Sequence, residues 1–137
     1  MLDTCTTLPG DPIRAPGNPA HLMWVKPFAR TVTVERKGQK LAETYHPLLV
    51  VELGRDLYHP VLYIPRKDVV AELAENMERT FCPLKGHASY FNLIGPGGAP
   101  VAQDIAWGYE DALPSATILQ GHLAFDTGQV TLIQSPI

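Results

Sequence analysis

Short stretches in which apolar and polar residues alternate make up most of the chain after residue 29. Val32 and Val34 alternate with threonine and glutamate, a period of two that is typical of a half-buried β-strand. A turn sequence follows at 36–39, and residues 40–44 are expected to return as the partner strand of a hairpin. Further strands are predicted over residues 48–53, 61–64, 88–94, 101–109, 121–125 and 130–134. The pattern therefore predicts about eight short strands, with 48–53 and 61–64 forming a second hairpin.

One segment between these strands has a helical period instead. Val69, Leu73 and Met77 recur at i, i+4 and i+8, while the glutamates of this segment fall on the solvated side. Asp68 precedes them and is a residue type that commonly caps a helix. We therefore expect one amphipathic α-helix of about three turns. Many short strands around a single helix predict a mainly β domain that is closed or folded on itself to protect its edges.

Residues 1–20 contain four prolines and two glycines. Proline lacks a backbone donor and has a fixed φ, so we expect this stretch to form neither a sheet ladder nor a helix interior. It is interpreted as an N-terminal arm that is mobile or lies on the surface. A single folded domain is expected over residues 21–137.

Composition and charge narrow the functional classes. The 137 residues indicate one domain, and the 45% of hydrophobic residues can bury a core without disulfide or metal staples. Eleven lysines and arginines against fourteen acids give a formal net charge of −3, and the basic residues are scattered. Nucleic-acid binders usually carry a basic stripe, so no nucleic-acid partner is expected. The longest aliphatic run, residues 48–51, is far shorter than the ~20 residues of a membrane span. Together with the absence of a secretory-signal pattern at the N-terminus, this predicts a cytoplasmic protein with no membrane partner.

Metal and cofactor motifs are also missing from the sequence. Cys5 and Cys82 form no Cys-x-x-Cys pair, and the five histidines show no metal-ligand spacing. The chain has no phosphate-cradling glycine loop and no nucleophile elbow. We expect neither a metal nor a cofactor. His87 lies five residues after Cys82 and is weighed as a general base, but a loop position is the favoured interpretation.

The segment Cys82-Pro83-Leu84-Lys85-Gly86 carries the clearest candidate chemistry. Its residue types predict a tight turn that brings Cys82 and Lys85 close together. An ammonium group beside a thiol favours the thiolate, so Cys82 would be a nucleophile with Lys85 as its electrostatic partner. The alternative is a small buried cysteine below a β-turn with a solvated lysine. On residue types alone this structural interpretation is favoured.

Two further clusters are candidates for a binding site. Trp107 and Tyr109 share one face of a predicted strand and could form the wall of a pocket, or belong to the core and the edge of the sheet. Arg66 lies close to the expected helix start, where it could bind an anion or pair with a surface acid.

Four ordered motifs give the chain a family resemblance. These are Tyr63-Ile64-Pro65-Arg66-Lys67-Asp68-Val69, Thr80-Phe81-Cys82-Pro83-Leu84-Lys85-Gly86-His87-Ala88-Ser89-Tyr90, Ala106-Trp107-Gly108-Tyr109-Glu110-Asp111 and Gly121-His122-Leu123-Ala124-Phe125. The series resembles the bacterial family called domain of unknown function four-two-seven. The resemblance implies a β-tent (Mss4-like) fold, in which two small antiparallel sheets are pitched against each other with a cavity between them. Relatives of that fold often hold a structural zinc, which we do not expect here because both Cys-x-x-Cys pairs are missing.

The resemblance also favours a pocket over simple packing. The residues that match the motif positions are Arg66, Thr80, Cys82, Lys85, Ser89, Tyr90, Trp107 and Tyr109. Our leading hypothesis is a module that binds a small, anionic molecule between the sheets. Trp107 and Tyr109 would form its wall, Arg66 and Lys85 would supply charge, and Thr80, Ser89 and Tyr90 would contribute polar contacts. One alternative is a cysteine-dependent enzyme with Cys82 as nucleophile and Lys85 lowering its pKa. Another is an interaction domain whose N-terminal arm docks on a partner or on a second copy in an oligomer.

Overall fold

The structure is a computed structural model that describes residues 10–136. Its strands are β1 (Ile13–Ala15), β2 (Asn18–Pro27), β3 (Arg30–Arg36), β4 (Gln39–Thr44), β5 (Leu48–Leu53), β6 (Val61–Pro65), β7 (Leu73–Cys82), β8 (Gly86–Ile94), β9 (Pro100–Ala112), β10 (His122–Phe125) and β11 (Thr131–Pro136). Three short 3₁₀ segments connect them, η1 (Arg66–Asp68), η2 (Pro96–Gly98) and η3 (Pro114–Leu119). All of the predicted strands are confirmed.

The strands form two antiparallel sheets, as expected. The larger sheet has eight strands in the order β1-β2-β5-β6-β10-β9-β8-β7, and the smaller has three in the order β11-β3-β4. Both predicted hairpins are present, because β3 pairs with β4 and β5 pairs with β6. The mainly β, two-sheet arrangement implied by the family resemblance is therefore confirmed, although one of the two sheets is large rather than small.

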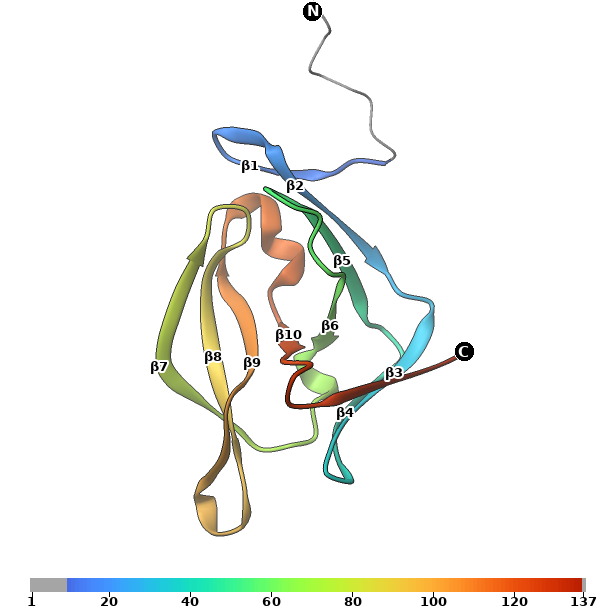
Figure 1. Cartoon of the computed structure of the whole chain (residues 1–137), viewed down its shortest axis with the longest axis vertical. Helices are drawn as coiled ribbons and strands as arrows, with labels where there is room; N and C mark the ends of the chain where they lie inside the picture. The colour runs from blue at the N-terminus through green and yellow to red at the C-terminus, as the bar shows by residue number, and fades with distance from the viewer. Residues whose placement is uncertain (1–9, 137) are drawn as a thin grey trace, which may run out of the picture.

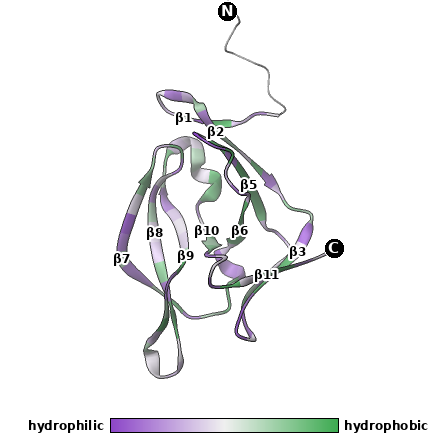
Figure 2. Cartoon of the chain, viewed as in Figure 1, coloured by the Kyte–Doolittle hydropathy of each residue, from purple (hydrophilic) through white to green (hydrophobic). Residues whose placement is uncertain are grey.

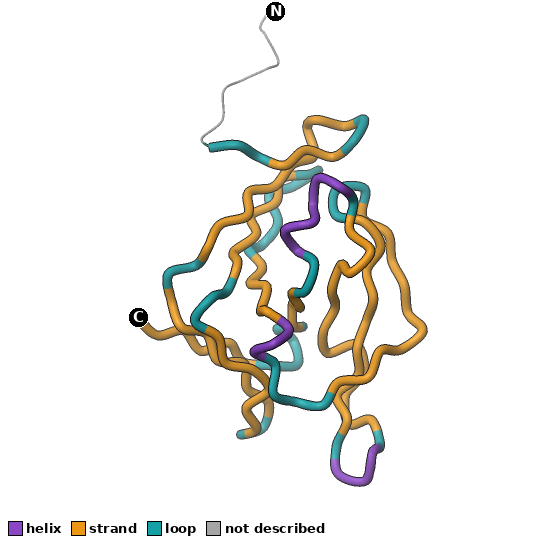
Figure 3. The backbone as a smooth tube through the Cα atoms, turned by 180° about the vertical axis from the view of Figure 1, so that it is seen from behind, coloured by secondary structure: helices purple, strands orange, loops and turns teal. Residues whose placement is uncertain are grey.

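The eight-stranded sheet is folded into two wings. In Figure 1 the wing of β7, β8 and β9 stands opposite the wing of β1, β2, β5 and β6, with β10 pairing to both β6 and β9 where the sheet turns. The segment η3 lies between the wings, which is also clear from behind in Figure 3. We call the part of the molecule that the two wings enclose, on the inner face of this folded sheet, the tent.

Each face of the large sheet has its own hydrophobic core. The inner core, between the wings, includes Tyr63, Ala88 and Ala124. The outer core, against the three-stranded sheet, includes their chain neighbours Ile64 and Leu123. Because successive side chains of a strand point to opposite faces, strands at the centre of this sheet are apolar on both sides. This explains the continuous apolar run of β6.

The predicted helix over Asp68 and the following residues is wrong. The described residues contain no α-helix, and most of this segment is the edge strand β7. Leu73 pairs with Leu93 of β8, whereas Met77, expected on the buried face, is 97% exposed. The Asp68 carboxylate does not cap a helix but accepts a hydrogen bond from the Thr44 hydroxyl at 2.6 Å. Pairing with β8 outweighs the local helical pattern.

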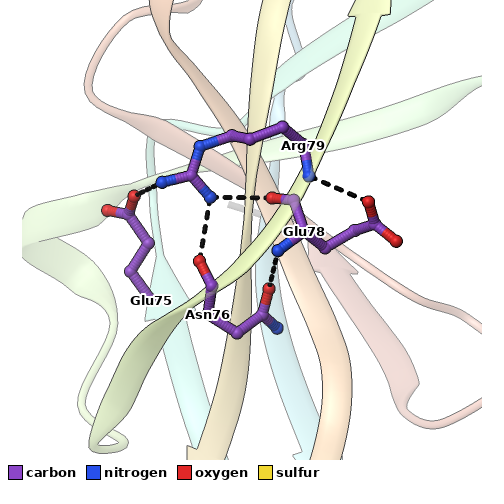
Figure 4. A network of polar contacts seen from close by, with 4 residues as sticks. All are labelled: Glu75, Asn76, Glu78 and Arg79. Atoms are coloured by element: carbon purple, nitrogen blue, oxygen red, sulfur yellow. Dashed lines mark hydrogen bonds and ion pairs between the residues drawn. The ribbon is translucent and has the colours of Figure 1, made fainter.

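Glu75 and Glu78, expected on the solvated side of the helix, lie instead in a β-bulge. The register between β7 and β8 shifts between Glu75 and Arg79, and Figure 4 shows the polar contacts within this segment. The Arg79 guanidinium pairs with the Glu75 carboxylate and donates to the carbonyls of Asn76 and Glu78 at 2.8 and 2.7 Å. The Asn76 side chain in turn accepts the backbone N–H of Glu78 at 2.8 Å. A bulged strand that carries Glu75, Glu78 and Arg79, with a hydrophilic middle in Figure 2, is a typical protection of a sheet edge.

The expectation that residues 1–20 form no ladder is also wrong. The strand β1 pairs with β2, which itself begins at Asn18. Gly17 makes the turn with a φ of +75°, and Ala15 is buried in the inner core. The prolines do not interrupt this pairing, because Pro16 lies in the turn and Pro19 lies where the register shifts, outside the residues of β2 that pair with β1. Residues 1–9, with Cys5, lie outside the described residues.

Gly86 provides a test of the turn that leads into β8. Its φ is +120°, and a Cβ would lie 2.5 Å from the Asp111 carbonyl oxygen. We expect Gly86→Ala to lower the free energy of unfolding by about 3 kcal/mol or more, because it adds backbone strain and overpacking. Gly17→Ala, where no atom lies within 4 Å of the new Cβ, is the control and should cost only about 1–2 kcal/mol. Urea unfolding would measure both, and equal losses would contradict this account.

Candidate functional site

The predicted turn after β7 buries a lysine. The backbone N–H of Lys85 donates to the carbonyl of Cys82 at 3.2 Å, which closes the turn. The expected proximity is confirmed, since Lys85 Nζ lies 3.9 Å from Cys82 Sγ. Lys85 is not solvated, however, because it is only 6% exposed. A buried ammonium group needs a compensating partner.

That partner is Glu52, which comes from β5 on the opposite wing. The Lys85 ammonium donates to Glu52 Oε1, and Glu52 Oε2 lies 2.7 Å from Nε2 of His21 on β2. The three side chains form a chain of polar contacts across the tent, with only 7%, 16% and 16% of their surfaces exposed for Lys85, Glu52 and His21. We refer to them as the Lys85–Glu52–His21 chain.

The electrostatics of this chain favour an ionised carboxylate. Burial alone would raise the pKa of Glu52, but its hydrogen bonds with His21 and Lys85 and their charges lower it below the ordinary value of 4.5. The Lys85 charge is thus balanced by Glu52. The Cys82 thiol is therefore not the only polar group beside the Lys85 ammonium.

Aromatic residues surround the chain on the inner face. Tyr109 is buried, and Lys85 Nζ lies 5.9 Å from the centroid of its ring. Burial raises the pKa of Tyr109 strongly, and that of Tyr63 too, although a hydrogen bond with Trp107 opposes the shift in Tyr63. Both phenols therefore stay neutral at physiological pH. The hydroxyl of Tyr90 lies 2.9 Å from that of Thr80 at the exposed rim.

The structure brings together six of the eight residues that match the family motifs. Thr80, Cys82, Lys85, Tyr90, Trp107 and Tyr109 lie on the inner face or at its rim. The Arg66 guanidinium instead lies 4.7 Å from the ring centroid of Phe91, which belongs to the outer core. Ser89 lies between Ala88 and Tyr90, both of the inner face, and so points to the other face. Arg66 and Ser89 therefore do not join Lys85.

His87 is placed on strand β8, not in a loop. Its Nδ1 lies 3.5 Å from the Asp111 carboxylate, and both side chains are largely exposed. Since its neighbour Ala88 faces inward, His87 faces away from Cys82.

A cavity of about 330 Å³ adjoins the His21 end of the Lys85–Glu52–His21 chain. It is lined by Asn18, Ala20, His21, Gly54, Arg55 and Tyr58, and we call it the His21 cavity. Gly54 leaves room for the ring of Tyr58, which lies 3.0 Å from where a Cβ would be. The cavity thus collects an imidazole, a guanidinium, a phenol and an amide.

Sequence reasoning missed Glu52 and His21 as site residues. Glu52 did carry a signal, because it is the only charged residue in the aliphatic strand β5 and has the same parity as inward-facing Val50. His21 carried no such signal in the sequence, because its partner Glu52 lies 31 positions away along the chain.

Residues 10–136 place no group of three or more histidines, cysteines or carboxylates where they could hold a metal ion. Within the same residues, no helix has the length and apolar character needed to cross a membrane.

A comparison with models of protein families identifies the family of the chain. The model described as "Domain of unknown function (DUF427)" matches residues 24–135. The chain belongs to this family. The matched DUF427 segment contains Glu52, Cys82 and Lys85, whereas His21 precedes it. No curated protein matches the sequence.

The Lys85–Glu52 contact predicts an asymmetric mutational effect. Glu52→Leu should destabilise the DUF427 domain by about 3–5 kcal/mol, because it leaves a buried ammonium without its carboxylate. Lys85→Met should cost less, because Glu52 keeps His21 as a partner. The double variant should lose less than the sum, by about 1–3 kcal/mol. Denaturant unfolding of the four proteins measures the cycle, and additive losses would contradict the coupling.

The lowered pKa of Glu52 also predicts a pH dependence. A group with a depressed pKa in the folded state contributes stability above its unfolded value, here 4.5, and loses it as pH falls through the folded value. The unfolding free energy of the natural sequence should therefore fall more steeply below pH 4.5 than that of Glu52→Gln. Glu43→Gln, in an exposed pair with Lys40, is the control. Equal slopes for the natural sequence and Glu52→Gln would argue against the assignment.

Proposed function

We propose that this DUF427 domain binds a small anionic molecule in the His21 cavity. The supporting observation is the Lys85–Glu52–His21 chain, which runs from a buried ammonium group to an imidazole on the cavity wall. Stability alone does not explain it, because a well-packed apolar pair is often as stable as a buried ion pair. Perturbed ionisable groups beside a cavity are typical of functional sites.

The lining chemistry suits an anion. Arg55 supplies a permanent positive charge, and the side chains of Asn18 and Tyr58 can donate hydrogen bonds. The described lining includes no carboxylate, and Glu52 behind it is engaged by Lys85 and His21. A volume of about 330 Å³ is at the small end of ligand pockets, which favours a compact metabolite.

Glu52 has a positioning role in this proposal. Its Oε2 accepts the Nε2–H of His21, so Nδ1 is the ring nitrogen left toward a ligand, and it donates to an anion when the ring carries both protons. Lys85 holds Glu52 through its other oxygen. The orientation of His21 thus depends on residues that do not themselves line the cavity.

A second candidate function is thiol-dependent catalysis at Cys82. It is supported by the distance of 3.9 Å between Cys82 Sγ and Lys85 Nζ and by the partial exposure of the cysteine. The Glu52 carboxylate weakens this support, because it already balances the Lys85 charge.

Thermal-shift and calorimetric titrations with phosphate, acetate, succinate and citrate would test anion binding. At least one probe should stabilise the natural sequence, by about 2.7 kcal/mol at a concentration of 100 Kd. Arg55→Gln and His21→Gln should each weaken its binding about tenfold or more, because each removes a hydrogen bond to a charged group.

Arg30→Gln is the control for charge, since Arg30 is an exposed cation beyond the other end of β2. It should leave binding unchanged, as should Cys82→Ser. Binding that survives both cavity substitutions, or the failure of every anion to bind, would reject the proposal. If the natural sequence converts any of these probes, loss of that conversion in Cys82→Ser would instead favour the thiol mechanism.

A further inference from the structure

A second, larger cavity lies where several strands end, apart from the His21 cavity. Its volume is about 690 Å³, and its apolar side chains include Phe28, Leu48 and Ile118. Its polar side chains include Lys67, His46 and His122. We call it the Phe28 cavity. Its size lies within the range of pockets that hold drug-sized ligands.

The walls of this cavity are fixed by hydrogen bonds that do not involve a ligand. The buried Thr44 hydroxyl donates to Asp68 at 2.6 Å and accepts the backbone N–H of His46 at 2.9 Å. The backbone N–H of Phe28 donates to the Pro47 carbonyl at 2.9 Å. The loop after β4 is thereby tied both to η1 and to the loop after β2, so the cavity is preorganised and a ligand need not order it.

The positive charge of the described lining comes from Lys67. Lys67 and two histidines line the cavity, and its described lining includes no aspartate or glutamate, although the chain has a net charge of −3. The nearby Asp68 carboxylate already accepts the Thr44 hydroxyl. His122 Nδ1 donates to the Gln120 carbonyl at 3.0 Å, which leaves its Nε2 available.

We infer that the Phe28 cavity binds an amphipathic monoanion, a molecule with an aliphatic or aromatic body and a single carboxylate. The body would cover Phe28, Leu48 and Ile118, of which Ile118 is 48% exposed without a ligand. The carboxylate would pair with the Lys67 ammonium and accept a hydrogen bond from a ring N–H of His46. His122 Nε2 would donate to it only when that ring carries both protons. Burial of the apolar body supplies affinity, and the cationic rim selects the acid over a neutral analogue.

Fluorescence titration with 8-anilinonaphthalene-1-sulfonate, an aromatic monoanion, provides the first readout. The dye should brighten on the folded natural sequence, and decanoate should displace it. Decan-1-ol, which has the same chain without the charge, should bind at least tenfold more weakly than decanoate. Equal affinities for the acid and the alcohol would overturn the role of the cationic rim.

Two substitutions localise the site. Lys67→Gln should weaken decanoate binding about tenfold but spare decan-1-ol, since it removes one charge-assisted contact. Ile118→Asp should abolish the binding of both, because it places a carboxylate in the apolar floor. Ile118 is half exposed, so we expect the fold to survive, which circular dichroism would check. Lys40→Gln, an exposed lysine elsewhere, is the control and should change nothing.

The outcomes separate this site from the His21 cavity. Arg55→Gln and His21→Gln should leave decanoate affinity unchanged, and unchanged affinity in Lys67→Gln and Ile118→Asp would overturn the inference. Light scattering gives a further outcome. If Ile118→Asp converts a dimer to a monomer while decanoate fails to bind, the surface is a contact between two copies and the inference is wrong.

Discussion

The contact between Lys85 and Glu52 is the constraint on which the inner side of the molecule depends. Lys85 lies in the turn between β7 and β8, and Glu52 lies on β5 of the opposite wing. An ammonium that is 6% exposed is tolerated only when its charge is met, so the two wings must close to this separation. The inner core then fills the remaining space with Tyr63, Leu84 and Tyr109. The separation of the two wings and the pairing of Lys85 with Glu52 therefore depend on each other.

Local backbone geometry serves the same contact. Gly86, with a φ of +120° and backbone atoms packed where a Cβ would be, lets the chain turn directly after Lys85. The Lys85 carbonyl also accepts the backbone N–H of Leu113, which leads into η3. The segment between the wings is therefore attached to the residue that joins them, and the position of Lys85 depends on backbone bonds as well as on Glu52.

The sequence predicts the strands well and the site only partly, for physical reasons. Alternation such as that around Val32 and Val34 reports the pleat of a strand directly. The segment around Leu73 misleads, because its charges satisfy an edge bulge that has nearly helical spacing, with Glu75 and Arg79 four residues apart. Cys82 and Lys85 were predictable because one turn places them. Glu52 meets Lys85 from 33 positions away, a contact that only the tertiary fold creates.

The two cavities share one electrostatic feature, which is the kind of side chain that lines them. Neither described lining includes an aspartate or glutamate, while β7 and the loop before it carry Glu72, Glu75 and Glu78 on an exposed edge. Acidic side chains do line other hollows of the surface, as Glu72 and Asp126 do, but these two cavities present Arg55, Lys67 and histidines. Such a separation lowers the electrostatic barrier to an anion at each cavity without making the whole domain basic. His21 adds to this from β2, ahead of the segment that matches the family at residues 24–135, whereas Glu52 and Lys85 lie within it. The charge pair that joins the two wings therefore belongs to the family segment, as Arg55 of the cavity does, whereas His21 lies in the part of β2 before residue 24.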